Sequence, residues 1–418
     1  MRTPKTAAAI GGRGAATRLL LPAGADASAL TLLIGRGLRG FCDGFVAVLL
    51  PAYLLALGFG QLDVGLVSSA TLIGSAAATI LVGIYARRCT LGRMLVLAAC
   101  LMTATGIGFA GSSALWPLLI VAVVGTLNPS SGDVSLFLPL ELARLAGSAA
   151  GDARTAIFAR YSLVGAVSAA VGALAAAIPG WLVAHAGLSL LSALRAMFGV
   201  YALVGVALWF LYRRLPEPQA HDRSRSAPLG PSRGIVTRLA LLFSVDAFAG
   251  GLVVNSLLSL WLMQRFGLSP GAAGAFFFWA GLLTAGSQLA AVPLARKIGL
   301  LNTMVFTHIP SSLCLIAAAF APSLALTLTL LLMRSALSQM DVPTRTAYVM
   351  AVVTPPERPA AASFTAVPRS LASALGPTLA GALLAMGWTG APLVACGLLK
   401  IAYDLTLLSS FRRVRLTD

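Results

Sequence analysis

Charged side chains are scarce in this sequence. Asp, Glu, Lys and Arg together make up 10% of its 418 residues, against about a quarter in soluble domains. Hydrophobic residues make up 58%, and many apolar runs reach the roughly 20 residues that cross a bilayer as a helix. This composition excludes an ordinary soluble protein and predicts an all-α polytopic membrane protein. The runs are continuous rather than alternating, so a transmembrane β-barrel is excluded as well.

Residues that bind metals or nucleotides are also few. The five cysteines lie in or at the ends of apolar segments without a Cys-x-x-Cys pair, so we expect neither a metal site nor a disulfide framework. The chain has only three histidines. No Walker or other nucleotide-binding motif occurs, and the short loops offer no catalytic cluster. We therefore expect no cofactor, no metal, no ATPase activity in this chain and no enzymatic function.

Negative charge is scarcer than positive charge, and the formal net charge is +17. In a soluble protein this surplus would indicate nucleic acid, but here its distribution indicates membrane topology and no nucleic-acid partner. Nearly all Lys and Arg outside the apolar runs fall on one side of the membrane, with Arg265 on the other, which is the positive-inside pattern. Arginine far outnumbers lysine, which is typical of a GC-rich bacterial genome. We therefore expect the inner membrane of a bacterium.

Glycine, proline and charge clusters divide the apolar sequence into twelve expected spans. These spans run approximately over residues 30–57, 63–86, 93–111, 115–144, 153–178, 188–212, 236–264, 270–295, 301–320, 323–351, 358–386 and 390–411. An even number of spans places both termini in the cytoplasm. The expected organisation is a disordered cytoplasmic tail at 1–29, a six-helix bundle at 30–212, a cytoplasmic linker at 213–234, a second bundle at 235–412 and a short tail at 413–418.

The two halves resemble each other at a nearly constant spacing, which indicates an internal duplication. Matching residues lie 207 to 209 positions apart. They include Gly44 with Gly251, Asp133 with Asp341, and Arg160 with Arg369. Because each half begins on the same side of the membrane, the repeat is parallel, related by an axis along the membrane normal.

One polar run inside an apolar segment is the strongest candidate site. Its residues follow at i, i+4, i+7 and i+11, which places them on one stripe of a helix. They are Arg334, Ser338, Asp341 and Arg345. A charge at the bilayer centre costs about 2.5–3.5 kcal/mol on insertion scales, so such residues usually face a cavity or a partner. The same stripe one repeat earlier contains Thr126, Ser130 and Asp133.

Twelve spans, a parallel repeat of six and a long central loop resemble the major facilitator superfamily of secondary transporters. A cytoplasmic motif of that family is represented here by Gly83-Ile-Tyr-Ala-Arg87-Arg88-Cys-Thr-Leu-Gly92-Arg93, without the family's Asp. The resemblance implies two pseudo-symmetric bundles and a central path lined by spans 1, 4, 7 and 10. It also implies that Arg87, Arg88 and Arg93 belong to a gate, and that His308 in span 9 packs outside the path.

The intramembrane acids agree with this path, because each of the four spans contains one. They are Asp43, Asp133, Asp246 and Asp341. Arg39 lies four residues before Asp43, a spacing that allows the two to pair. With no histidine expected in the path, a carboxylate would carry any coupling proton. In span 7, Asn255 and Ser259 lie on the opposite face from Asp246 unless the helix breaks at Gly250-Gly251, and the sequence leaves both alternatives open.

Four further pairs of charged residues are predicted. Spans 4 and 5 are neighbours in this family, as are spans 10 and 11, so Asp133 is expected near Arg160 and Asp341 near Arg369. Two interpretations stay open for these pairs: a gate that forms and breaks, or permanent compensation of buried charge. Glu141 and Arg144 are expected as a gate or surface pair. Lys400 and Asp404, at i and i+4, are expected as a structural ion pair.

These observations predict a monomeric secondary transporter that moves a small solute by alternating access, and they predict no enzymatic role. Basic residues outnumber acidic residues within the spans, which favours an organic anion as the solute, and the intramembrane carboxylates favour protons as the coupling ion. The alternative is a proton-driven efflux pump for drugs or cations.

Overall fold

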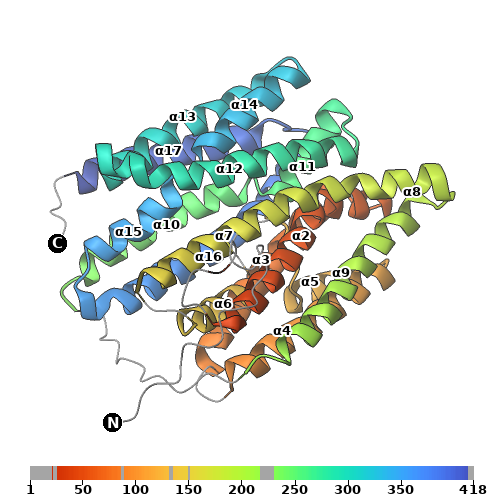
Figure 1. Ribbon diagram of the computed structural model, residues 1–418. Coiled ribbons are helices and arrows are strands. Elements are labelled where there is room, and N and C mark those ends of the chain that lie inside the picture. Colours follow the sequence, from red (N-terminus) through yellow and green to blue (C-terminus); the bar gives the residue numbers. More distant parts are fainter. Residues whose placement is uncertain are drawn as a thin grey trace, which may run out of the picture.

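The computed structural model describes residue 21 and residues 26–85, 89–130, 135–148, 151–216 and 230–412. In these ranges every regular element is a helix, and the helices form two bundles (Figure 1). The all-α membrane fold predicted from the composition is confirmed. Nine helical segments of the described residues are long and apolar enough to cross a membrane. The remaining expected spans, 4, 10 and 11, are present as helices that are interrupted or more polar.

The N-terminal bundle contains one short 3-10 helix and eight α-helices. They are α2 (Ala27–Ala56), α3 (Gln61–Tyr85), α4 (Leu91–Gly111), α5 (Leu115–Val124), α6 (Phe137–Ala146), α7 (Gly151–Leu174), η1 (Ala175–Ala177), α8 (Ile178–Ala186) and α9 (Leu190–Tyr212). The expected spans 1, 2, 3 and 6 correspond to single helices. Span 4 is divided between α5 and α6, and span 5 continues through η1 into α8.

The C-terminal bundle repeats this arrangement. Its elements are α10 (Arg233–Gly251), α11 (Asn255–Phe266), α12 (Pro270–Ile298), α13 (Leu300–Phe320), α14 (Leu324–Leu337), α15 (Asp341–Ala351), η2 (Pro355–Glu357), α16 (Arg358–Ala385) and α17 (Ala391–Phe411). Span 7 is divided between α10 and α11, and span 10 between α14 and α15.

The breaks in spans 4, 7 and 10 have local causes. Gly125 follows α5 in an extended conformation, and Pro129, which lacks an N–H, prevents the helix from resuming at once. In span 7, Gly250-Gly251 ends α10. In span 10, Pro343 would clash with the carbonyl of Gln339 in a continuous helix. It lies instead in the first turn of α15, where the missing N–H costs no hydrogen bond.

Glycines let equivalent helices approach closely in the two bundles. A Cβ on Gly44 of α2 would lie 2.0 Å from the Ala169 carbonyl oxygen of α7, and one on Gly251 of α10 would lie 2.3 Å from the Ser373 carbonyl oxygen of α16. The matched glycines therefore occupy equivalent positions. In each half, the first span packs on the fifth span at this glycine. This is the packing that a parallel duplication predicts.

The two bundles meet on the side of the membrane away from the chain termini, which we call the far side. The side where α2 begins and α17 ends is the terminal side. On the far side α3 packs on α16, where Ser69 bonds Thr378 at 2.7 Å, and α11 packs on α2 and α3. The Ser256 N–H donates to the Pro129 carbonyl at 3.1 Å. On the terminal side, α6 and α15 each pack on helices of their own half.

Candidate functional site

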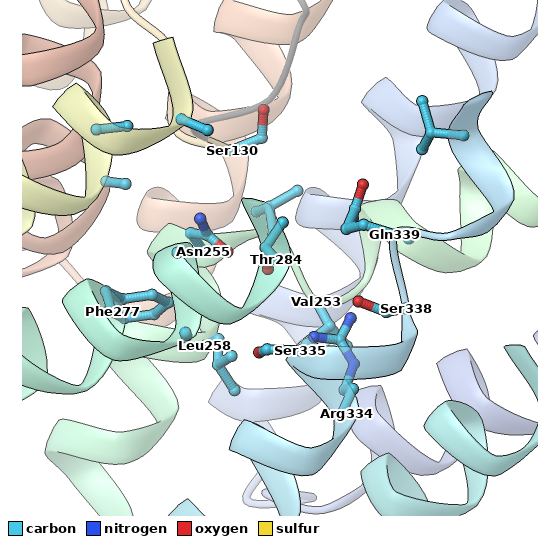
Figure 2. Close-up of a pocket in the computed structure, with 18 of the residues that line it drawn as sticks. Ser130, Val253, Asn255, Leu258, Phe277, Thr284, Arg334, Ser335, Ser338 and Gln339 are labelled. Carbon is cyan, nitrogen blue, oxygen red and sulfur yellow. The ribbon is translucent and has the colours of Figure 1, made fainter. Parts of the chain in front are cut away.

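A cavity of about 410 Å³ lies between the two bundles. This volume falls in the range of about 300–1,000 Å³ that is typical of small-molecule sites. The described helices that line it are α2, α3 and α7 of the N-terminal half and α10 to α17 of the C-terminal half. Figure 2 shows its polar and apolar walls. Phe277 and Leu258 form part of the apolar wall, whereas Ser130, Asn255 and Thr284 contribute polar atoms.

Arg334 contributes a guanidinium group to this cavity from the last turn of α14. Figure 2 shows its side chain directed into the cavity, on the same wall as Ser335, Ser338 and Gln339. Within the described part of the chain, the Arg334 side chain forms no hydrogen bond and no ion pair. A cation in this position has donors available for a solute.

The polar stripe of span 10 lines the cavity, although the continuous helix expected for it is wrong. Helix α14 ends at Leu337 and α15 begins at Asp341, so Ser338 lies in the break between them. Arg334, Ser338, Asp341 and Arg345 nevertheless all line the same cavity. The backbone bends without turning these side chains away from one another, because Ser338 and Met340 keep helix-like dihedral angles.

In span 7 the helix is broken after Gly250-Gly251, which is one of the two alternatives that the sequence left open. The break after Gly251 brings Asn255, the first residue of α11, to the same cavity as Asp246 of α10. Ser259 lies away from the cavity and donates to the Val48 carbonyl oxygen of α2 at 3.4 Å. Asn255 is therefore a lining residue, and Ser259 belongs to the contact between the bundles.

Asp246 is the centre of an ionic cluster in the C-terminal half. Its Oδ2 lies 3.0 Å from Arg345 Nη1, and its Oδ1 lies 2.6 Å from Lys400 Nζ. Arg345 also binds Asp341, with Nη2 at 2.8 Å from Oδ2. Asp341 thus forms an ion pair with Arg345, rather than with Arg369 as predicted. All four side chains line the cavity, so the cluster forms its charged wall.

Two predictions about span 9 and span 12 are wrong. Lys400 binds Asp246 instead of Asp404, and Asp404 binds His308, whose Nδ1 lies 3.0 Å from Oδ2. His308 was expected outside the path, yet it lines the cavity, and its Nε2 lies 3.3 Å from Lys400 Nζ. Spacing along one helix favoured the i, i+4 pair, but α13 packs directly on α17 and offers Asp404 a nearer partner.

The N-terminal half contains a different buried cluster around Glu141. This carboxylate is fully buried and accepts hydrogen bonds from Arg39 and from the hydroxyls of Tyr161 and Tyr212. Arg39 therefore has Glu141 as its ion partner, where the sequence suggested Asp43. The prediction of a surface role for Glu141 is wrong, because α6 turns it into the bundle. Arg144 donates to the Pro216 carbonyl oxygen.

The remaining predicted residues lie in several places. Ser130 lines the cavity, whereas Thr126 bonds the Tyr201 hydroxyl at 3.0 Å, because span 4 is not a continuous helix there. Arg369 lines the cavity, and Arg160 has a buried Nη1 without a partner among the described residues. Asp43 is buried and Arg93 is exposed at the start of α4. Asp133, Arg87 and Arg88 lie outside the described residues.

Basic side chains outnumber acidic ones among the described residues that line the cavity. Five basic side chains line it, namely Arg36, Arg334, Arg345, Arg369 and Lys400, against the carboxylates of Asp246 and Asp341. Arg345 and Lys400 form ion pairs with these two acids. Sequence analysis missed Arg36, Lys400 and His308 as lining residues. Each is an ionisable residue within an apolar segment, which is the signal that marks such positions.

Comparisons with known proteins agree with this architecture. Residues 239–415 match the family model described as Major Facilitator Superfamily. An uncharacterised membrane protein of Saccharomyces cerevisiae is 24% identical over 410 residues, which span 90% of this chain and 92% of the relative. The solved nucleoside transporter NupG aligns with a TM-score of 0.71 at 14% identity, covering 93% of this chain and 100% of its own. The human organic anion transporter MFSD10 aligns with a TM-score of 0.63 at 18% identity, covering 91% of this chain and 98% of its own.

Proposed function

We propose that this chain, which belongs to the Major Facilitator Superfamily, is a secondary active transporter for a small organic anion. The transporter fold is the premise, and the anionic solute is the inference drawn from the cavity. The observation that carries it is the guanidinium of Arg334, which has no partner among the described residues and is directed into a cavity whose described lining has more basic than acidic side chains.

The chemistry of the cavity supports an anion with a carboxylate or phosphate group. An arginine offers donors in a planar fork that matches such groups with two parallel hydrogen bonds. Ser335, Ser338 and Asn255 line the same cavity and add neutral donors and acceptors. The apolar wall at Phe277 and Leu258 suits an organic body attached to the anionic group. A hydrogen bond to a charged group contributes about 1.5–3 kcal/mol, so Arg334 would contribute substantially to affinity.

The contacts between the bundles support alternating access. The far side holds the contacts between halves at Ser69 and Ser256, whereas α6 and α15 pack within their own halves. This arrangement corresponds to a state closed on the far side. By the positive-inside pattern the terminal side is cytoplasmic, so the state would face inward. Rocking of one bundle against the other would expose the same site outward.

The proposal includes protons as the coupling ion and a bacterial inner membrane as the location. Ionisable groups in the cavity wall, Asp246 and Asp341 among them, support exchange of protons with the cavity water. The described lining of the cavity comes from one copy of the chain, which supports a monomer as the functional unit.

A thermal-shift screen tests the anionic solute. The purified chain in detergent is heated with organic carboxylates and phosphate esters and with matched uncharged and cationic analogues, at one ionic strength. A compound that binds the folded state raises the unfolding temperature, and at a fixed concentration a tighter ligand raises it more. We expect anions to stabilise the native chain and Arg334→Gln to weaken that binding about 10- to 100-fold, the factor that about 1.4–2.7 kcal/mol gives.

Arg238→Gln is the matched control. Arg238 lies in α10, is exposed and does not line the cavity, so its replacement should leave anion binding unchanged. Stabilisation by cationic or uncharged analogues with no response to anions would reject the proposal and favour the efflux alternative.

A further inference from the structure

His308 lies between two partners that bind its two ring nitrogens. Its Nδ1 is 3.0 Å from Asp404 Oδ2, and its Nε2 is 3.3 Å from Lys400 Nζ. Asp246 Oδ1 lies 3.9 Å from the same Nε2 and 2.6 Å from Lys400 Nζ. His308, Lys400 and Asp246 all line the cavity. The imidazole is therefore buried among charged groups and still borders the space through which solute and water would pass.

This geometry matches a neutral imidazole. In that form Nδ1–H donates to the Asp404 carboxylate and the Nε2 lone pair accepts from the Lys400 ammonium. Lysine has donors only, so a proton on Nε2 ends the hydrogen bond with Lys400 and places two cations in contact. The new Nε2–H would face Asp246 Oδ1, the oxygen that Lys400 occupies. Protonation thus sets imidazolium and ammonium in competition for one carboxylate oxygen.

The ion-paired cluster contains one more carboxylate than cations when His308 is neutral. Asp246, Asp341 and Asp404 are three carboxylates, and Arg345 and Lys400 are two cations, joined by the ion pairs described above. With a neutral His308 the group has a net charge of −1, which is costly in a buried site. A proton on His308 brings the net charge to zero.

Other ionisable groups face this site from each neighbouring helix. Helix α17 carries Tyr403, whose ring lies 6.2 Å from the imidazole and whose hydroxyl lacks a hydrogen-bond partner among the described residues. Helix α15 carries Arg345 and Asp341, which the ion pairs described above connect to Asp246. Helix α14 carries Arg334, whose backbone carbonyl accepts from Ser311 of α13. Helix α12 lines the cavity with Phe276, Phe277 and Thr284 and adds no charge there. These neighbours leave the carboxylates and Lys400 as the groups that respond to a proton on His308.

We propose that His308 is the proton-binding site of this chain, and that its protonation releases Lys400 from Asp246 into the cavity. A proton from the cavity water adds to Nε2, the Lys400–His308 hydrogen bond breaks, and Nε2–H replaces the ammonium at Asp246 Oδ1. No covalent bond other than N–H forms. Asp404 is a positioning residue, since it fixes the tautomer through Nδ1.

Release of Lys400 gives the cavity a further free cation beside Arg334. On the premise of the proposed function, an anion and a proton would then bind together, because the proton creates the charge that the anion neutralises. Arg334 would determine which solute binds, and His308 would determine when the cavity accepts it.

Amine labelling tests this proposal without any solute. The chain contains three lysines, Lys5, Lys297 and Lys400. Lys297 is exposed at the end of α12 and serves as an internal reference. The protein in lipid nanodiscs is methylated with formaldehyde and cyanoborohydride at several values from about pH 8 to about pH 5, the range in which imidazole groups change charge. Mass spectrometry then gives the ratio of Lys400 to Lys297 labelling.

We expect this ratio to rise several-fold as the pH falls in the native chain. The general effect of pH on amines cancels in the ratio, so the rise reports release of Lys400. It should be absent in His308→Gln and displaced to lower pH in Asp404→Asn. The control His185→Gln, at an exposed position that bonds the Trp181 carbonyl, should retain the native profile.

A constant ratio in the native chain, or an unchanged rise in His308→Gln, would overturn the proposal. If His308→Gln fails to fold, the native and Asp404→Asn profiles still decide the outcome. Because no solute is present, this result is independent of the screen with Arg334→Gln. Failure of that screen would reject the anionic solute and leave the proton site standing.

Discussion

Arg39 and Asp246 occupy equivalent positions in the two halves and carry opposite charges. They lie 207 positions apart, the spacing that also relates Gly44 to Gly251. Arg39 binds Glu141 of α6, and Asp246 binds Arg345 of α15. In each half, an ion pair therefore connects the first span to the short helix that follows the break in the fourth span. The ion pair is therefore at the same place in both halves, but the basic partner lies on the first span of one half and the acidic partner on the first span of the other.

The Arg39–Glu141 pair predicts an asymmetric response to mutation. Glu141→Gln leaves the buried Arg39 without a countercharge and should cost about 3–5 kcal/mol of stability. Arg39→Met should cost less, because the hydroxyls of Tyr161 and Tyr212 still donate to the Glu141 carboxylate. Denaturant-induced unfolding in a mild detergent measures both. The double variant should be more stable than Glu141→Gln alone, and strict additivity of the two losses would contradict the ion pair.

Glu357, in the terminal-side loop before α16, predicts a pH dependence of stability. Its buried carboxylate accepts hydrogen bonds from Ser232 and Thr354 hydroxyls, both at 2.6 Å, and from the Gly230 N–H. These donors lower the pKa of Glu357 to about 2. A lowered pKa gives stability that is fully present above the ordinary value near 4.5 and is lost as the pH falls toward about 2.

The native unfolding temperature should therefore fall more steeply than that of Glu357→Gln over this interval. Ser232→Ala, which removes one donor, should show an intermediate slope. Parallel curves for native chain and Glu357→Gln would show that these hydrogen bonds do not stabilise the folded state.

The far-side contact between bundles predicts a conformational effect of one glycine. A Cβ on Gly65 of α3 would lie 2.4 Å from the Pro377 carbonyl oxygen of α16. Gly65→Val should therefore separate the bundles on the far side and open the cavity there. Gly83→Val in the same helix is the matched control, since a Cβ there meets no atom within 4 Å.

Thiol labelling measures this opening. Asn255→Cys places a thiol at the cavity, and a membrane-impermeant maleimide supplied from the far side should label it faster in combination with Gly65→Val. The Gly65→Val single variant corrects for the native cysteines. An equal labelling rate of Asn255→Cys in the Gly65→Val and Gly83→Val backgrounds would contradict closure of the cavity on the far side.

Much of the fold follows from the sequence, because apolar length and periodic breaks determine the spans. Gly250-Gly251 and Pro129 mark two of the three interrupted spans. The stripe from Arg334 to Arg345 lines one cavity although its helix is broken. Helical spacing therefore predicted which side chains lie together, but it did not predict the break between them.

Ion pairs and hydrogen bonds between side chains on different helices are harder to predict from the sequence. Lys400 and Asp404 have the spacing of an ion pair, yet the rotation of α17 against α13 directs Asp404 to His308 and Lys400 to Asp246. The position of Glu141 in the sequence suggests a residue near the membrane surface, but its two tyrosine donors come from other helices, α7 and α9. Such partners depend on how helices rotate and cross, which local spacing does not determine.

Exchange in proteoliposomes tests the central claim most directly. The purified chain is reconstituted without nucleotide, the vesicles are loaded with the anion that stabilises it most in the thermal-shift screen, and labelled anion is added outside. The account predicts accumulation of label by the native chain and by Arg238→Gln, and loss of accumulation in Arg334→Gln. Absence of exchange by the native chain, or equal exchange by Arg334→Gln, would contradict it.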